Sequence, residues 1–141
     1  MSYTHTVTVP LSWEDAVERT REALGEQGFG ILTEINIRAT FDSKLGTDAA
    51  DAVGDYMILG ACNPTLASRA LAAEPELGAL LPCNVIVRRS KDARETTVET
   101  IDPQTMVQFS DSLAVREVAD DADGRLGKAL ARLGAAKDIS D

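Results

Sequence analysis

Two cysteine–asparagine pairs, each placed between an apolar run and a turn, constrain the fold more than any other feature of this chain. The first pair, Cys62-Asn63, follows the apolar run 56–60 and precedes Pro64. Asparagine is a good helix cap, and proline lacks the amide hydrogen that would stay unpaired at the first helical position. The sequence therefore predicts a short buried strand over 56–60 that leads into a capped helix.

The second pair, Cys83-Asn84, follows Pro82 and opens an alternating run that continues to Arg89. Such alternation is typical of a strand with one buried face. After a charged turn, β-branched residues return over 96–101, which predicts an antiparallel hairpin. Each pair thus stands at a predicted strand end, and we expect the two cysteines to converge on one place.

Periodicity predicts the remaining elements. Alternation indicates strands over 3–9 and 29–37, and in the second strand the odd-numbered residues from Phe29 to Ile37 share one face. Residues 46–55 are small and acidic, and we predict a mobile loop there. Spacings of three and four predict helices over these ranges: 13–24, 39–45, 64–74, 106–109 and 111–133.

This order of strands and helices predicts a single domain of the α+β class, with a mainly antiparallel sheet and helices packed on one face. A chain of 141 residues is long enough to bury a real core. We expect that core to extend over about residues 4–133 and the tail 134–141 to fray.

The formal net charge of −9 argues against nucleic acids and anionic membranes as partners, because both require a basic surface. No apolar run approaches the roughly 18 residues of a membrane span. The first residues also lack the apolar stretch of a secretion signal. These features predict a cytoplasmic protein whose cysteines, Cys62 and Cys83, stay reduced.

His5 is the only histidine, so any serine–histidine–aspartate triad would have to use it. It shares the parity of Val7 in its predicted strand, and we interpret it as a packed or surface side chain. Residues 121–124 are similar to part of a calcium loop. However, Ala119 and Leu130 stand where such a loop needs carboxylates. We therefore interpret 121–124 as a solvated acidic face.

Three interpretations of the cysteines remain open. Cys62 and Cys83 are too far apart for a Cys-x-x-Cys redox motif, and free cysteines are often simply buried in a core. Cys62 also precedes a helix N-terminus, whose dipole favours a reactive thiolate. A zinc site needs about four ligands, so the thiols and His5 would require a carboxylate or a second subunit. Glu74 and Glu76 could act as general acid or base, although a solvent-exposed pair is the simpler interpretation.

Several motifs together resemble the domain-of-unknown-function family DUF 302. They are Gly60-Ala61-Cys62-Asn63-Pro64, Leu80-Leu81-Pro82-Cys83-Asn84-Val85, residues 28–35, Lys44-Leu45-Gly46 and the Asp102-Pro103 helix start. The resemblance covers roughly residues 4–133. It implies a compact bacterial or archaeal α+β domain, likened in fold to half of the TATA-binding protein, that forms a homodimer. It implies no activity, and the segment 47–55 is longer than in the family's pattern.

The favoured hypothesis is a cytoplasmic homodimer that binds a small ligand or partner in a pocket near Cys62, Asn63, Cys83 and Asn84. An alternative is a thiol-dependent redox or sulfur-transfer protein, with Cys62 as nucleophile and Cys83 as resolving thiol. A weaker alternative is a metal site shared across a dimer. We predict no cofactor and no resident metal, and an enzyme is not the favoured interpretation.

Overall fold

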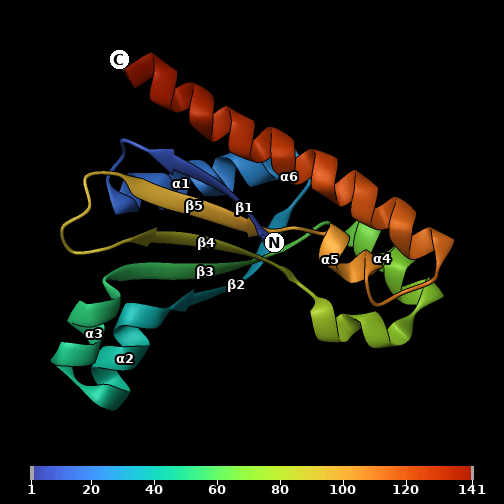
Figure 1. The fold of residues 1–141 in the computed structure, drawn as a ribbon, viewed down its shortest axis with the longest axis horizontal. Coiled ribbons are helices and arrows are strands. Elements are labelled where there is room, and N and C mark those ends of the chain that lie inside the picture. The colour runs from blue at the N-terminus through green and yellow to red at the C-terminus, as the bar shows by residue number, and fades with distance from the viewer. Residues whose placement is uncertain (1, 141) are drawn as a thin grey trace.

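A five-stranded antiparallel sheet forms the centre of the molecule (Figure 1). The computed structural model describes the backbone of residues 2–140 and the side chains of residues 2–134. The strands lie in the spatial order β1-β5-β4-β3-β2, so the first two strands of the chain form the two edges. Their bounds are Thr4–Val9 (β1), Gly30–Asn36 (β2), Asp55–Cys62 (β3), Cys83–Arg89 (β4) and Thr96–Ile101 (β5).

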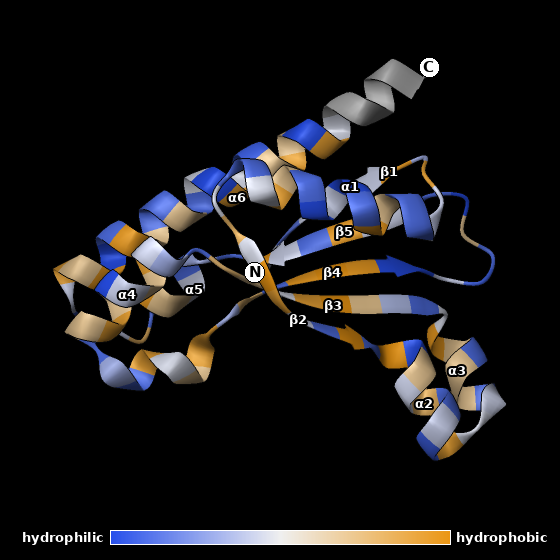
Figure 2. Cartoon of the chain, turned by 180° about the vertical axis from the view of Figure 1, so that it is seen from behind, coloured by the Kyte–Doolittle hydropathy of each residue, from blue (hydrophilic) through white to orange (hydrophobic). Residues whose placement is uncertain are grey.

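Two helices, α1 and α6, cover one face of the sheet and leave the other face open (Figures 1 and 2). A pair of helices, α2 and α3, extends from one end of the sheet, while α4 and α5 pack against α6 at the other end. The predicted α+β class, with helices on one face of an antiparallel sheet, is confirmed. The helices are α1 (Trp13–Glu26), α2 (Ile37–Leu45), α3 (Thr47–Val53), α4 (Pro64–Ala73), the 3₁₀ helix η1 (Pro75–Leu80), α5 (Gln104–Val107) and α6 (Leu113–Ser140).

Helix α6 contributes to two apolar cores. The larger core lies between the sheet, α1 and the second half of α6, and it includes Val9, Val17, Leu24, Phe29, Leu59, Val85, Val87, Val98, Leu126 and Leu133. The smaller core lies between α4, η1, α5 and the first half of α6, and it consists of Leu66, Ala70, Leu77, Met106, Val115, Val118, Ala119 and Ala122. Burying one of the larger aliphatic side chains stabilises the fold by about 1.5–3 kcal/mol. Because α6 contributes such side chains to both cores, it links the two cores.

The predicted strand over 29–37 exists, but its odd-numbered residues do not share one face. The pairing of β2 with β3 shifts between Ile31 and Thr33, which leaves Leu32 bulged and 66% exposed. Thr33 then pairs with Gly60 and faces the open side of the sheet. A β-carbon on Gly60 would collide with the Thr33 hydroxyl, so the pairing of Thr33 with this position favours a glycine there.

Residues 46–55 do not form the predicted loop, because Thr47–Val53 is helix α3. Alanine has the highest helix propensity, and the segment contains three alanines between glycines with positive φ at both ends. Ala50 is buried, and its carbonyl accepts a hydrogen bond of 3.3 Å from the guanidinium of Arg38. That guanidinium also contacts Asp51 at 2.6 Å, which ties α3 to α2.

The last helix is longer than predicted, since α6 continues to Ser140 rather than ending at Leu133. The prediction that residues 134–141 fray concerns mainly residues whose side chains the structure does not describe. Within the described part of the chain, no helix combines the length and the apolar character needed to cross a membrane.

Candidate functional site

The adjacent ends of β3 and β4 bring the two cysteines to one cavity. Ala61 pairs with Cys83 in the sheet, so Cys62 lies one residue beyond this pair. Both cysteines line a cavity of about 40 Å³ where the two cores meet. Asn63 also lines it, and the other lining residues are apolar: Phe29, Ala61, Leu66, Ala67, Ala70, Leu81, Pro82, Met106, Val118 and Ala122. Three of the four predicted site residues therefore lie together.

Asn63 caps helix α4, as the sequence predicts. Its side-chain oxygen accepts a hydrogen bond of 3.2 Å from the backbone amide of Leu66, and only 9% of Asn63 is exposed. Its amide group packs against Gly28, where a β-carbon would lie 3.0 Å from the Asn63 Nδ2 atom. Gly28 has a φ of +84°, so glycine suits this position for both its backbone conformation and its small size.

Arg125 of α6 connects the same junction to the end of α1. Its Nη1 atom donates a hydrogen bond of 3.0 Å to the carbonyl of Gln27, and its Nε atom donates one of 2.7 Å to Asp121. The end of α1, the start of α4 and the middle of α6 therefore meet around Asn63. The sequence offers no signal for this role of Arg125, because its partner carbonyl is distant along the chain.

Burial keeps the Cys83 thiol neutral. Desolvation, together with the proximity of Cys62, raises the pKa of Cys83 to about 11. A buried thiol with such a pKa is almost entirely protonated near neutral pH, so it is a weak nucleophile. Cys62 is only half-buried and directly precedes the cap residue Asn63, and both thiols are free.

Asn84 lies on the opposite face of the sheet from Cys83. The side chains of Cys83 and Val85 point into the core, while Asn84 is exposed and pairs with Gly60 in the register. Successive strand residues alternate between faces, so Asn84 cannot line the cavity that Cys83 lines. The structure thus brings Cys62, Asn63 and Cys83 together at this cavity and places Asn84 away from it.

Glu74 is part of a hydrogen-bond network rather than a solvent-exposed pair with Glu76. Its Oε1 atom accepts a hydrogen bond of 2.5 Å from the hydroxyl of the buried Ser110. Ser110 also accepts a bond of 3.1 Å from the amide of Ser112. These contacts tie the end of α4 to the start of α6, while Glu76 is exposed. The interpretation of two solvated carboxylates is therefore wrong for Glu74.

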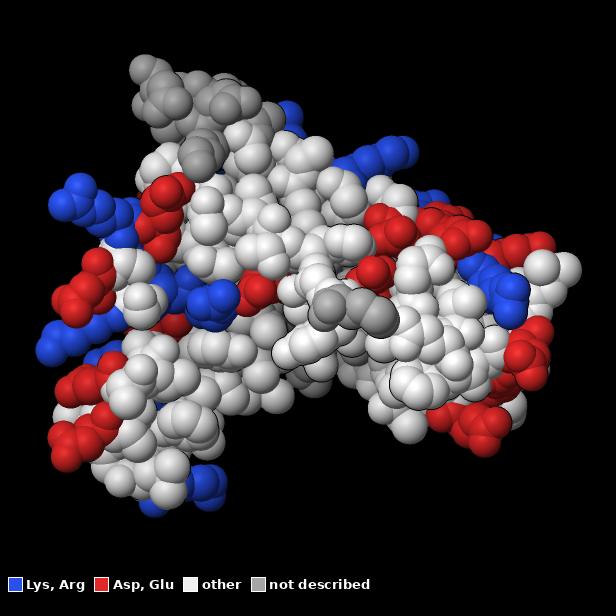
Figure 3. Space-filling view, viewed as in Figure 1, with Lys and Arg blue, Asp and Glu red and all other residues white. Residues whose placement is uncertain are grey.

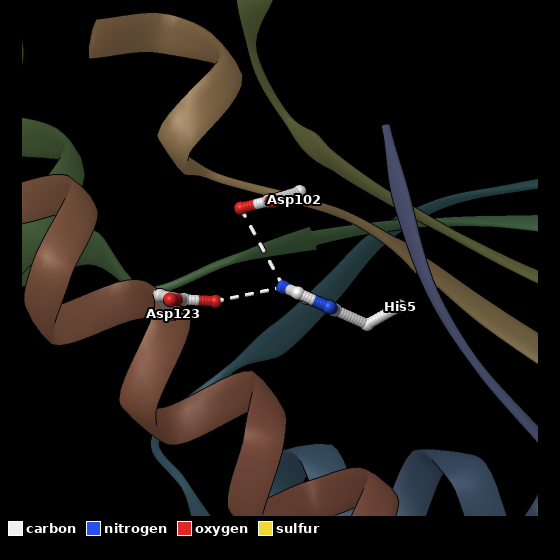
Figure 4. Close-up of side chains that lie close together, drawn as sticks. All are labelled: His5, Asp102 and Asp123. Carbon is white, nitrogen blue, oxygen red and sulfur yellow. Dashed lines mark hydrogen bonds and ion pairs between the residues drawn. The ribbon is translucent and has the colours of Figure 1, made fainter. Parts of the chain in front are cut away.

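A second cluster of polar side chains forms around His5 (Figure 4). Its Nε2 atom lies 3.0 Å from Asp123 of α6 and 3.5 Å from Asp102, which directly follows β5. Sequence reasoning treated these residues separately and missed the cluster. The sequence predicts the two strands 3–9 and 96–101. Their antiparallel pairing places Asp102 beside the start of β1, and therefore near His5.

The capping role of Asn63 can be tested against Asn84, which provides a matched control. We expect Asn63→Ala to lower the free energy of unfolding by about 1–2 kcal/mol, since it removes the cap and leaves the buried amide of Leu66 without a partner. Asn63→Asp keeps the acceptor oxygen and should retain most of the stability. Asn84→Ala should change the free energy by less than about 0.5 kcal/mol in urea unfolding experiments. Equal losses for both alanine variants would contradict the capping role.

Comparison with known proteins is consistent with this architecture. The family model described as "Domain of unknown function DUF302" matches residues 5–133. The crystal structure of an uncharacterized conserved DUF302 protein from Bacillus stearothermophilus has a TM-score of 0.82 and 27% sequence identity to this chain, and the match covers 94% of this chain and 99% of that one. No curated protein matches the chain. The chain belongs to the DUF302 family.

Proposed function

We propose that this domain binds a small apolar ligand in the cavity lined by Cys62, Asn63 and Cys83. The proposal rests on one observation: the two thiols line the same cavity, and most of the other side chains that line it are apolar. Ligand sites are mostly apolar, with a few polar groups that orient the ligand. Here the two thiols and the Asn63 amide are those polar groups.

The volume of the cavity limits the ligand. Pockets for drug-sized molecules have volumes of about 300–1,000 Å³. The cavity here has about 40 Å³, which accommodates only a few atoms. The domain therefore takes either a very small molecule or the apolar end of a larger one, with the rest of that ligand outside the cavity. A larger ligand would have to separate α4 from α6.

A thiol-dependent redox or sulfur-transfer function is the alternative, and one observation favours it. Cys62 is a free, partly exposed thiol that stands immediately before the capped N-terminus of α4. The raised pKa of Cys83 weakens this alternative, because a resolving cysteine attacks as a thiolate. A metal site shared across a dimer through these cysteines is weaker still, since it needs ligands from a second chain.

Alkylation of single-cysteine variants with iodoacetamide at pH 8 distinguishes ligand binding from redox chemistry. In Cys62→Ser, we expect Cys83 to react at least about 100-fold more slowly in the native protein than in denaturant, because its pKa lies about two units above that of a free thiol. The matched Cys83→Ser variant measures Cys62 in the same way.

Mild oxidation of the wild-type protein completes this test. We expect oxidised glutathione to form no Cys62–Cys83 disulfide, and peptide mass spectrometry would detect one. Rapid native alkylation of Cys83, or a disulfide between the two thiols, would contradict the ligand-binding proposal and support the redox alternative.

We further propose that two chains associate through the open face of the sheet, as a cytoplasmic homodimer that binds neither nucleic acid nor membrane. Three isoleucines, Ile35, Ile58 and Ile86, lie side by side in the register of β2, β3 and β4 on this face. Next to them on the same face, Arg88 contacts Glu99 at 2.6 Å. Figure 3 shows uncharged surface over much of this face, with a few basic and acidic side chains close together within it and further charges around its edges.

This arrangement suits a two-fold interface. An isologous contact requires one patch to complement itself, and a face that carries both Arg88 and Glu99 beside an apolar row can do so. The apolar row has to overcome repulsion between two chains of net charge −9 each. The same charge supports the absence of nucleic acid among the partners.

Light scattering at micromolar concentration tests the dimer. We expect the wild-type protein to have twice the mass of one 15.1 kDa chain. Ile58→Lys should give a folded monomer, because it places a charge in the middle of the apolar row. Leu45→Lys replaces an exposed leucine away from the sheet and should remain dimeric. A monomeric wild-type protein, or a dimer that persists in Ile58→Lys, would contradict this interface.

A further inference from the structure

We propose that His5, Asp102 and Asp123 bind a divalent transition-metal ion within a single chain. Each residue offers one ligand atom, and these atoms all lie within 4.8 Å of one another. Figure 4 shows the two carboxylates approaching the same ring nitrogen, one from α6 and one from the segment after β5. This site is separate from the cysteine cavity, and it requires no second chain.

The two distances from His5 match those between neighbouring ligands of one ion. The Nε2 atom of His5 lies 3.0 Å from the Oδ1 atom of Asp123 and 3.5 Å from the Oδ1 atom of Asp102. Ligands at about 2.1 Å from a metal lie about 3.0 Å apart in an octahedral site and about 3.4 Å apart in a tetrahedral one. The ligand atoms of Asp102 and Asp123 lie within 4.8 Å of each other, so a metal ion can contact all three atoms once the two carboxylates move closer together.

Three rigid parts of the fold hold the ligands. His5 lies in β1, where its backbone is opposite Thr100 of β5. The amide of Asp102 donates a hydrogen bond of 2.9 Å to the carbonyl of Tyr3, which extends the pairing of β1 and β5 by one step. Asp123 lies within α6, directly after the buried Ala122. The site is thus positioned by the sheet and by the helix that packs on it.

The orientation of Asp102 is fixed by a further contact. Its Oδ1 atom accepts a hydrogen bond of 2.9 Å from the amide of Gln104, and the side chain of Gln104 donates one of 2.8 Å to Asp120. Such contacts to a ligating carboxylate orient it and reduce the cost of binding. An octahedral or tetrahedral ion would keep positions for water, because the side chains of His5, Asp102 and Asp123 are 40%, 23% and 34% exposed.

The ligand set selects the class of metal. One imidazole and two carboxylates suit Zn²⁺ and similar ions, whereas Ca²⁺ prefers six to eight oxygen ligands. Two carboxylates also neutralise a divalent charge. Without a metal, the Nε2 atom of His5 carries at most one hydrogen. That hydrogen can point well at only one of the two carboxylates. A cation between the three atoms would contact both.

The sole histidine of the chain allows a direct test by NMR. The experiment uses tag-free protein with Cys62→Ser and Cys83→Ser, so that zinc cannot bind the thiols. We expect one equivalent of ZnCl₂ to shift the imidazole C–H resonances of His5 and to complete the change at that ratio. We expect the same amount of CaCl₂ to leave them unchanged. Unchanged imidazole resonances with zinc, or equal shifts with calcium, would overturn the proposal.

Calorimetry with variants identifies the carboxylates. We expect Asp123→Asn and Asp102→Asn each to weaken zinc binding by about tenfold or more, since even residues that only orient ligands contribute about 10- to 100-fold. Glu117→Gln removes a carboxylate elsewhere on α6 and should leave the affinity unchanged. Thermal unfolding without metal shows that each variant is folded. Zinc binding that both aspartate variants retain at full strength would place the metal elsewhere and refute the site.

Discussion

The architecture depends most on the hydrogen bond with which Asn63 caps α4 at the end of β3. The chain changes there from strand to helix, and the same side chain packs against the turn at Gly28 that ends α1. Arg125 binds the neighbouring carbonyl of Gln27, so α6 is joined to this point as well. Because α6 contributes to both cores, these polar contacts lie at the point where the helices at the end of the sheet join the sheet itself.

The cavity follows from this arrangement. It lies where two cores of small aliphatic residues meet without filling all the space between them, and the strand ends place Cys62 and Cys83 in its wall. The two thiols are chemically identical, but their surroundings differ. Cys83 is buried and protonated, whereas Cys62 is partly exposed beside a helix N-terminus. This difference supports the ligand-binding proposal over the redox alternative, because a reversible disulfide needs both sulfurs to react.

Local signals in the sequence predicted most of the fold. The cap at Asn63, the strand that begins at Cys83 and the amphipathic last helix all follow from neighbours within a few residues. The bulge at Leu32 could not be predicted, because it is a shift in the pairing of β2 with β3, a strand about 25 residues away along the chain. The His5 cluster likewise joins residues separated by almost the whole chain. The position of Asn84, in contrast, could be predicted from the sequence. The alternation that places Cys83 in the core places the next residue, Asn84, on the opposite face.

The proposal that the two thiols line an apolar ligand cavity is tested most directly by a crystal structure of this protein under xenon pressure. Xenon binds in dry apolar cavities and gives strong anomalous scattering. The proposal predicts a xenon atom between the residues that line the cavity, in contact with the side chains near Cys62 and Cys83. A cavity that stays without xenon, or that is filled by ordered water bound to the thiols, would contradict it.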